Sequence, residues 1–346
     1  MVAKTIKQWT VTGDKKGFDE LKLEVVDFPK CGENEVVVKL NAASLNYRDL
    51  IIPQGKYPFP LGLPVVACSD GAGEVVEVGS KVRQWKKGDK VVTLFNQGHQ
   101  YGPMTTLASK TGLGGVLDGT LREYGVFNEN GLVRQPNNLS AIEASTLSCA
   151  ALTAWNALYG SKPLKPGQTV LVLGTGGVSM FGLQFARAAG AKVIATTSSD
   201  AKAEKLRKLG ADHVINYKTD PNWGETARKL SMNGEGVDHI LEVGGPATLK
   251  QTVKAIKYEG ILSIIGFVGG ENNVEVPQIV DALSNICTFR GVYVGSKEQM
   301  EDMVNAIEAN DIHPVVDDEV FEFEKAKEAY HYQWDQRHFG KVVIKI

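Results

Sequence analysis

Apolar runs and helix-period segments alternate along the second half of the chain. The run Thr169–Leu173 is almost wholly apolar and predicts a buried strand. A segment with helical periodicity, Val178–Ala189, follows it and ends at Gly190. The β-branched run Lys192–Thr197 then predicts a second strand. Strand, helix and strand in this order form a βαβ unit, whose two strands lie parallel.

Three later runs continue this pattern between helical segments: His213–Tyr217, His239–Val243 and Ile261–Phe267. Strands that alternate with helices are typical of a parallel sheet covered by helices on both faces. We therefore predict an α/β fold with a doubly wound parallel sheet over residues 141–290.

The first part of the chain has a different pattern. Short β-type runs broken by Gly and Pro predict a compact, mostly β domain over residues 1–140: Glu35–Leu40, Gly73–Val78 and Lys90–Leu94. The glycine-rich stretch 95–121 has little periodicity, and such a stretch usually lines a site or is mobile.

The final residues, 291–346, mix the two patterns. Met300–Ala309 is helical in periodicity, whereas Val320–Phe323 and Lys341–Ile346 are strand-like. We expect this segment to return to the first domain and complete it.

The turn after the first strand of the βαβ unit carries Gly174, Gly176, Gly177 and Val178. The first glycine permits a tight turn, and the second lets the backbone approach a pyrophosphate at the helix N-terminus. Ser179 stands at the third glycine position of this fingerprint, where a small side chain still permits close packing. In the alternative interpretation the glycines serve turn geometry only.

The end of the second strand bears on the choice of dinucleotide. An acid usually holds the ribose 2′-OH of NAD at this point, but this strand ends in hydroxyl residues and Asp200 reads as part of the next helix. Ser198, Ser199 and Lys202 suit a 2′-phosphate and predict NADP. The alternative is that these three residues only cap and solubilise a helix.

Composition excludes several classes of function. The 346 residues carry a formal net charge of −2, with Lys and Arg scattered, so neither nucleic acid nor an anionic membrane is expected as main partner. The first residues lack the apolar core of a signal peptide, and no apolar run reaches the length of a membrane span, so we expect neither. The four cysteines lie far apart with no C-x-x-C, which is typical of reduced thiols in a cytosolic protein.

Seven ordered segments together resemble the medium-chain dehydrogenase/reductase superfamily, and specifically its zinc-free quinone-oxidoreductase (zeta-crystallin-like) branch. They are AASLNYRDLI (42–51), LPVVACSDGAGEVVEVG (63–79), KKGDKV (86–91), DGTLREY (118–124), SCAALTAWNAL (148–158), the glycine unit and HFGKVVIKI (338–346). The resemblance implies a Rossmann cofactor domain and a GroES-like catalytic domain. It also implies a homodimer that pairs the strand Cys287–Tyr293 across a two-fold axis.

Departures within these segments concern the metal. The positions of the catalytic zinc ligands in metal-dependent members are Asn46, Ser69 and Cys149 here, and only the cysteine is retained. An amide and a hydroxyl with one thiol form a poor zinc site. The stretch 95–121, which matches the four-cysteine lobe of zinc members, contains no cysteine. We therefore predict that both zinc ions are absent.

The resemblance places Asn46, Tyr47 and Arg48 at the start of the segment that faces the nicotinamide, and we take them as candidate catalytic residues. An amide N–H can polarise a carbonyl, and a phenol can donate a proton to an enolate. Arg48 could hold an anionic intermediate or a cofactor phosphate. The alternatives are a packing role for Tyr47 and a salt bridge to Asp49 for Arg48. His99 could touch substrate, although a lone loop histidine is more often plain surface.

Further cofactor contacts are implied by the resemblance: Thr153 beside the nicotinamide, Tyr217 at the adenine or ribose, Gly244 and Phe267 at strand ends, Tyr293 and Val294 through their backbone, and Lys341 at the pyrophosphate or ribose.

Together these features predict an NADPH-dependent reductase that transfers hydride to a quinone or an α,β-unsaturated carbonyl without zinc. Hydride delivery to an enone needs a hydrogen-bond donor and a proton, whereas alcohol oxidation benefits from a Lewis acid. Two alternatives remain open: a zinc-independent NADP-dependent aldehyde or ketone reductase, and a non-catalytic NADPH-binding redox sensor.

Overall fold

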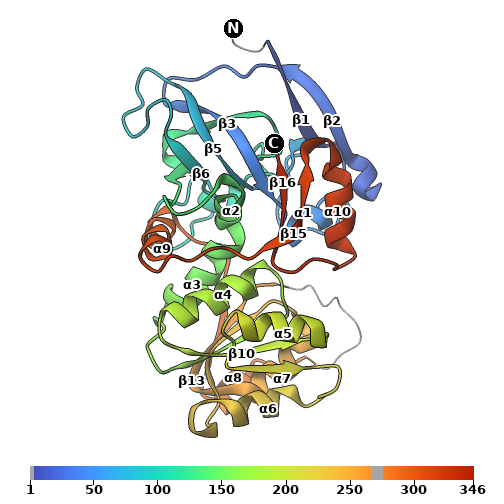
Figure 1. Cartoon of the computed structure of the whole chain (residues 1–346), viewed down its shortest axis with the longest axis vertical. Helices are drawn as coiled ribbons and strands as arrows, with labels where there is room; N and C mark the ends of the chain where they lie inside the picture. The colour runs from blue at the N-terminus through green and yellow to red at the C-terminus, as the bar shows by residue number, and fades with distance from the viewer. Residues whose placement is uncertain (1–3, 267–275) are drawn as a thin grey trace. The chain divides into compact units, whose positions relative to one another are not determined.

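The computed structural model describes residues 4–266 and 276–346, and the chain forms two compact units. Unit 1 consists of Met1–Leu152 and Gly295–Ile346, and unit 2 consists of Thr153–Val294. These boundaries lie later in the chain than residues 140 and 290, where the sequence pattern changes. The C-terminal residues thus belong to the same unit as the N-terminal ones. Figure 1 shows the course of the chain.

Unit 2 is built on a six-stranded sheet in the order β11-β10-β9-β12-β13-β14. Every pair of neighbouring strands is parallel. The strand order reverses between β9 and β12, which is the arrangement of a doubly wound dinucleotide-binding sheet. This confirms the predicted fold class. The strands are β9 (Thr169–Leu173), β10 (Lys192–Thr197), β11 (His213–Asn216), β12 (Val237–Glu242), β13 (Ile256–Ile264) and β14 (Thr288–Gly291).

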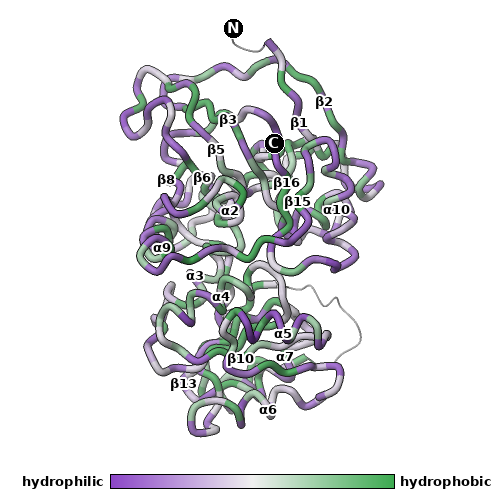
Figure 2. The backbone as a smooth tube through the Cα atoms, viewed as in Figure 1, coloured by the Kyte–Doolittle hydropathy of each residue, from purple (hydrophilic) through white to green (hydrophobic). Residues whose placement is uncertain are grey.

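Helices connect these strands, as parallel pairing requires. The connecting helices are α4 (Gly177–Ala188), α5 (Asp200–Lys208), α6 (Trp223–Leu230), α7 (Pro246–Ala255) and α8 (Val280–Ser284). Helix α3 (Leu152–Tyr159) begins at the unit boundary and precedes β9. All five residues of β9 are buried, because helices cover both faces of a central parallel strand. Figure 2 shows the apolar character of β10 beside it.

Unit 1 is mostly β structure. A seven-stranded sheet runs β15-β16-β3-β5-β6-β8 with β7 also paired to β3, and a three-stranded sheet runs β2-β1-β4. The strands are β1 (Thr5–Val11), β2 (Leu21–Asp27), β3 (Glu35–Ser44), β4 (Val65–Val66), β5 (Asp70–Val78), β6 (Lys90–Thr93), β7 (Tyr124–Asn128), β8 (Leu132–Arg134), β15 (Val316–Glu322) and β16 (Lys341–Lys345).

Four α-helices of unit 1 are α1 (Tyr47–Ile51), α2 (Ala141–Ala144), α9 (Lys297–Ala309) and α10 (Ala326–Trp334). A core cluster joins α10 to the strands through the fully buried Tyr330, with Leu45, Leu50 and Phe321 in the same cluster. Strand β16 pairs with β3 in antiparallel register, Val343 opposite Ser44. Because of this pairing, the C-terminal strand lies beside the segment that leads into α1.

The stretch 95–121 contains one short 3-10 turn, Ala108–Lys110, and isolated bridges, which agrees with its lack of periodicity. Among residues 4–266 and 276–346, no helix combines the length and apolar character that a bilayer crossing requires.

Candidate active site

The glycine turn of unit 2 has the geometry of a pyrophosphate site. Gly174 has φ +72°, a conformation that L side chains rarely adopt, and its N–H donates to Thr196 O at 3.0 Å. A Cβ built on Gly174 or on Gly176 would meet nothing within 4 Å. Gly176 caps helix α4 without a side-chain hydrogen bond, so the first N–H groups of this 12-residue helix remain for an anion. The space around Gly174 and Gly176 and the available N–H groups at the N-terminus of α4 fit the pyrophosphate of a dinucleotide.

Ser179 replaces the third glycine without loss of packing. Its Oγ donates to Leu173 O at 2.6 Å and thereby satisfies a carbonyl at the end of β9. The residue that needs to be small lies one turn later. A Cβ on Gly182 would lie 2.5 Å from Leu241 Cδ2, so Gly182 is what lets α4 approach the sheet.

The hydroxyl residues after β10 include the predicted helix cap. Ser199 is the N-cap of α5, and its Oγ accepts from Lys202 N at 3.4 Å. Asp200 is the first residue of α5, as expected, and accepts from Asn216 Nδ2 at 2.9 Å. The capping role is therefore present. A second role of Ser198, Ser199 and Lys202 at a 2′-phosphate stays a prediction.

The other predicted cofactor residues of unit 2 lie mainly near carboxyl ends of strands. Tyr217 follows β11, and its N–H donates to Thr197 O. Gly244 follows β12, and its N–H donates to Glu242 Oε1 at 2.8 Å. Thr153 is buried at the start of α3. Phe267 lies outside the described residues. These assignments stay predictions.

Asn156 and Arg290, which no sequence motif indicated, hold the segment that contains Tyr293 and Val294. Val294 has φ +53°, and its carbonyl accepts from Asn156 Nδ2 at 2.6 Å. Arg290 in turn donates to Asn156 O and Oδ1 at 2.8 and 2.7 Å. No local motif indicates this pairing, because Asn156 lies on α3 and Arg290 on β14.

In unit 1, Asn46 is linked to a buried lysine. Lys341 Nζ donates to Leu45 O at 2.6 Å and to Asn46 Oδ1 at 2.7 Å. Asn46 Nδ2 lies 3.5 Å from Ser69 Oγ, which donates to Asp70 Oδ1 at 2.6 Å. Asp70 Oδ2 lies 3.7 Å from Lys341 Nζ and closes a four-membered network. We call Lys341, Asn46, Ser69 and Asp70 the Lys341 network.

The Lys341 network is withdrawn from solvent, since Lys341 is 3 % exposed and Asp70 is fully buried. Asp70 also accepts from the Cys149 backbone N–H at 3.2 Å. No sequence motif indicated Asp70, and the family resemblance implied that Lys341 contacts the cofactor. The ammonium donates two of its hydrogen bonds within unit 1, and a cofactor contact of Lys341 stays a prediction.

The three positions that match zinc ligands converge here, but their chemistry does not suit zinc. Asn46 and Ser69 supply an amide and a hydroxyl, and an ammonium lies against the amide oxygen. Burial, and then the Asp70 carboxylate, raise the pKa of the Cys149 thiol to about 12, so no thiolate forms at neutral pH. Among residues 4–266 and 276–346, no three His, Cys, Asp or Glu side chains cluster as a metal site.

Arg48 makes the contact that its alternative interpretation expected. Its Nη1 lies 3.2 Å from Asp49 Oδ1, and its guanidinium stacks near the rings of Tyr57 and Phe95. Burial raises the pKa of Asp49 to about 6, against the opposing effect of Arg48. Asp49 Oδ2 also accepts from the Asn46 N–H at 2.8 Å, which fixes the start of α1.

Tyr47 opens α1, is half-buried and packs against the core cluster of unit 1. Burial raises the pKa of its phenol, so the hydroxyl keeps its proton in the neutral range.

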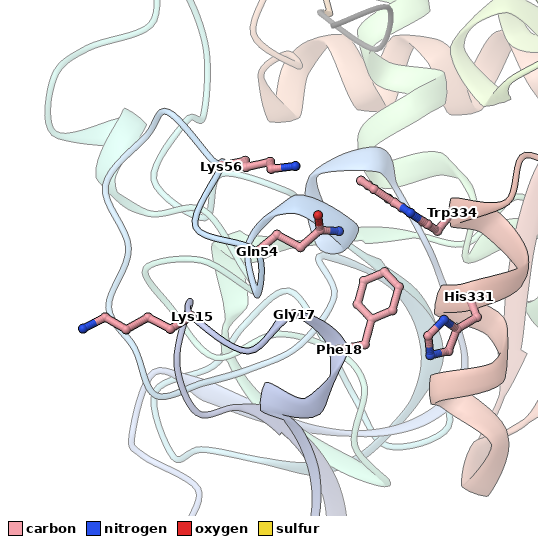
Figure 3. A pocket seen from close by; sticks show the side chains of 7 residues that line it. All are labelled: Lys15, Gly17, Phe18, Gln54, Lys56, His331 and Trp334. Atoms are coloured by element: carbon pink, nitrogen blue, oxygen red, sulfur yellow. The ribbon is translucent and has the colours of Figure 1, made fainter.

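His99 Nε2 lies 2.9 Å from Gly102 O within its own loop. A separate hollow of unit 1, about 460 Å³ in volume, is lined by Phe18, His331 and Trp334 among others and includes no residue of the Lys341 network (Figure 3).

Two family models match the chain: an alcohol dehydrogenase GroES-like domain over residues 32–137 and a zinc-binding dehydrogenase domain over residues 177–309. A zinc-type alcohol dehydrogenase-like protein of Schizosaccharomyces pombe is 51% identical over 98% of this chain and 99% of its own. A crystal structure of a putative alcohol dehydrogenase from Sinorhizobium meliloti 1021 has a TM-score of 0.91 and 39% identity, with both chains covered in full.

Other relatives are named alcohol dehydrogenases, as in Geobacillus stearothermophilus (29% identical over 94% of this chain and 96% of its own), and two further relatives have names that describe a reduction. A chloroplast envelope quinone oxidoreductase homolog of Arabidopsis thaliana is 30% identical over 96% of this chain and 95% of its own. An acryloyl-coenzyme A reductase of Sulfurisphaera tokodaii is 29% identical over 98% of this chain and 100% of its own. The matched domains, the extent of identity and the doubly wound sheet agree, and the chain belongs to the medium-chain dehydrogenase/reductase superfamily of oxidoreductases.

Proposed function

We propose that the protein is an NADPH-dependent reductase that transfers hydride to a quinone or an α,β-unsaturated carbonyl without a metal. The observation that carries the proposal is the Lys341 network. At the positions where metal-dependent relatives hold a Lewis acid, this chain presents an amide donor and a buried ammonium. The names of the quinone oxidoreductase homolog and the acryloyl-coenzyme A reductase favour the same class of substrate.

Each unit has its own part in the proposed reaction. In unit 2 the glycine turn and the start of α4 bind the pyrophosphate through backbone N–H groups. NADPH, when bound, supplies the hydride. In unit 1 the Asn46 amide donates a hydrogen bond to the substrate carbonyl oxygen, where negative charge develops as hydride reaches the β-carbon. Tyr47 then donates a proton to the resulting enolate, which completes the addition of two hydrogens.

The preference for NADPH rests on Lys202 and its hydroxyl neighbours. Lys202→Ala is expected to weaken NADPH binding about 10- to 100-fold, because a charge-assisted contact to the 2′-phosphate is lost. NADH affinity should change less than about twofold, which serves as the internal control. Titration calorimetry with both dinucleotides measures the difference. Equal losses for the two dinucleotides would assign Lys202 to the helix alone.

A homodimer formed along the β14 edge fits the surface of unit 2. Strand β14 is an edge of the sheet, and apolar side chains of the preceding segment are exposed, Ile279 at 94% and Leu283 at 76%. Large exposed apolar side chains and a sheet edge in the same part of the chain are typical of an interface. All four cysteines are free thiols, which fits a cytosolic protein.

The experiment that tests this function is steady-state NADPH consumption with a panel of quinones, enones, enoyl thioesters and simple aldehydes. We expect turnover with quinones or enones, by a preparation that holds far less than one zinc per chain. Turnover with aldehydes alone would favour the carbonyl reductase. Tight NADPH binding without consumption would favour the redox sensor, and stoichiometric zinc would contradict the metal-free mechanism.

A further inference from the structure

We propose that Lys341 is a positioning residue: its ammonium orients the Asn46 side chain, so that the amide nitrogen and not the amide oxygen is offered to the substrate. This inference rests on the proposed function for its catalytic consequence. The geometry on which it stands lies wholly within unit 1 and is independent of the substrate.

The ammonium of Lys341 selects the oxygen of the Asn46 amide. A lysine side chain has three N–H donors and no acceptor, so only the oxygen of the Asn46 amide can face it. The Nζ–Oδ1 distance of 2.7 Å is that of a charge-assisted hydrogen bond. A second hydrogen bond, to Leu45 O at 2.6 Å, holds the ammonium in place. The two ends of the amide are therefore distinguished by contact with a fixed cation.

The remaining contacts of the Lys341 network favour the same orientation of the amide. Asn46 Nδ2 faces Ser69 Oγ at 3.5 Å, and the Ser69 hydroxyl points its hydrogen to Asp70 Oδ1 at 2.6 Å. Ser69 therefore presents a lone pair to the amide nitrogen. Asp70, 3.7 Å from Lys341 Nζ, balances the charge of the ammonium. Every member of the Lys341 network thus favours one orientation of the Asn46 amide.

The Asn46 amide nitrogen has a hydrogen to donate to a substrate. Of the two hydrogens on Asn46 Nδ2, one faces Ser69 Oγ, and the other has no acceptor among the residues that the structure describes. Asn46 is 9% exposed, the most of the four residues. With the amide reversed, an oxygen would face the carbonyl oxygen of a substrate, and the two would repel each other.

The pairing of β16 with β3 places Lys341 beside Asn46. Strand β16 lies antiparallel to β3 with Val343 opposite Ser44, and Leu45 N donates to Val342 O at 3.0 Å. Continued by two residues, this register brings Lys341 level with Asn46. The position of the ammonium is thus fixed by a sheet and not by a loop.

The test is Lys341→Met, whose unbranched chain fills a similar space without the cation. We expect kcat at saturating NADPH to fall about 100-fold, as for loss of one preorganised donor. A contact of Lys341 with the cofactor would show separately, as a higher Kd for NADPH. The matched control is Lys297→Met, another buried lysine of unit 1, whose Nζ donates to Gln84 Oε1 at 3.2 Å. The control should retain kcat.

A double-mutant cycle separates positioning from general damage. In an Asn46→Leu background, Lys341→Met should cost less than about threefold in kcat, because Lys341 acts through the amide. Full additivity of the two losses would overturn the proposal.

A second readout does not need a substrate. The ¹⁵N spectrum of the full-length protein should show two separate resonances for the Asn46 Nδ2 hydrogens. They are identified by their absence in Asn46→Leu, and these hydrogens should exchange slowly with solvent. In Lys341→Met they should exchange at least about tenfold faster. Unchanged exchange would overturn the orientation argument even if the enzyme is active. If the Asn46 Nδ2 hydrogens of the native protein exchange slowly but the protein reduces no member of the panel, the proposed function would be refuted and the orientation of the amide would stand.

Discussion

Gly176→Ala is expected to weaken the binding of both NADPH and NADH by at least about 100-fold while leaving the fold intact. Loss of two or more charge-assisted hydrogen bonds to a pyrophosphate, each contributing about 1.5–3 kcal/mol, accounts for this magnitude. The added methyl group would meet no protein atom within 4 Å, and Gly176 has φ −78°, which alanine adopts freely. The space that it fills is the space that the pyrophosphate needs.

The control for this variant is Gly167→Ala. Gly167 also has no atom within 4 Å of a built Cβ, but its φ of +81° is strained for alanine. We expect Gly167→Ala to lower Tm more than Gly176→Ala does and yet to bind the dinucleotides normally. Calorimetric titration and thermal unfolding of both variants measure the contrast. Normal cofactor affinity in Gly176→Ala would show that the pyrophosphate does not bind at this turn.

Tyr47→Phe is expected to lower kcat about 100-fold, within the range of general acid catalysis, with the NADPH Kd unchanged. Because burial raises the phenol pKa, the hydroxyl should remain a proton donor throughout the neutral range, and kcat of the native protein should not fall there through loss of this proton. A kcat–pH profile of native and variant protein, with the best panel substrate, tests both statements.

Tyr332→Phe provides a matched control for Tyr47→Phe. Tyr332 is also half-buried against the core cluster of unit 1, and its hydroxyl donates to Asp317 Oδ1 at 2.9 Å. Its loss should affect stability and not turnover. An unchanged rate in Tyr47→Phe would leave Tyr47 with the packing role alone and would require another proton source.

Local pattern was sufficient for the strands at the centre of unit 2. β9 and β10 begin and end where the sequence predicts, because their residues are buried on both faces and read as unbroken apolar or β-branched runs. β13 begins at Ile256, five residues before the predicted Ile261. Its first part contains exposed polar residues and Glu259 at φ +62°, which no hydrophobic period indicates.

The candidate site shows the limit of local pattern more clearly. Asn46, Ser69 and Cys149 could be identified by resemblance, but Asp70 and the role of Lys341 could not. Their proximity depends on the register of β16 against β3, two strands almost 300 residues apart in sequence. Gly182 was missed for a related reason, since its importance comes from the Leu241 side chain on another strand.

The pairing of β16 with β3 also has a consequence for synthesis on the ribosome. Unit 2 is continuous in sequence, so it can fold as soon as it emerges, whereas unit 1 needs residues from both sides of it. Until β16 emerges, the stretch Ala42–Ser44 of β3 lacks its final neighbour on one side. During that interval the nascent chain presents an open sheet edge, the kind of surface that chaperones protect from aggregation.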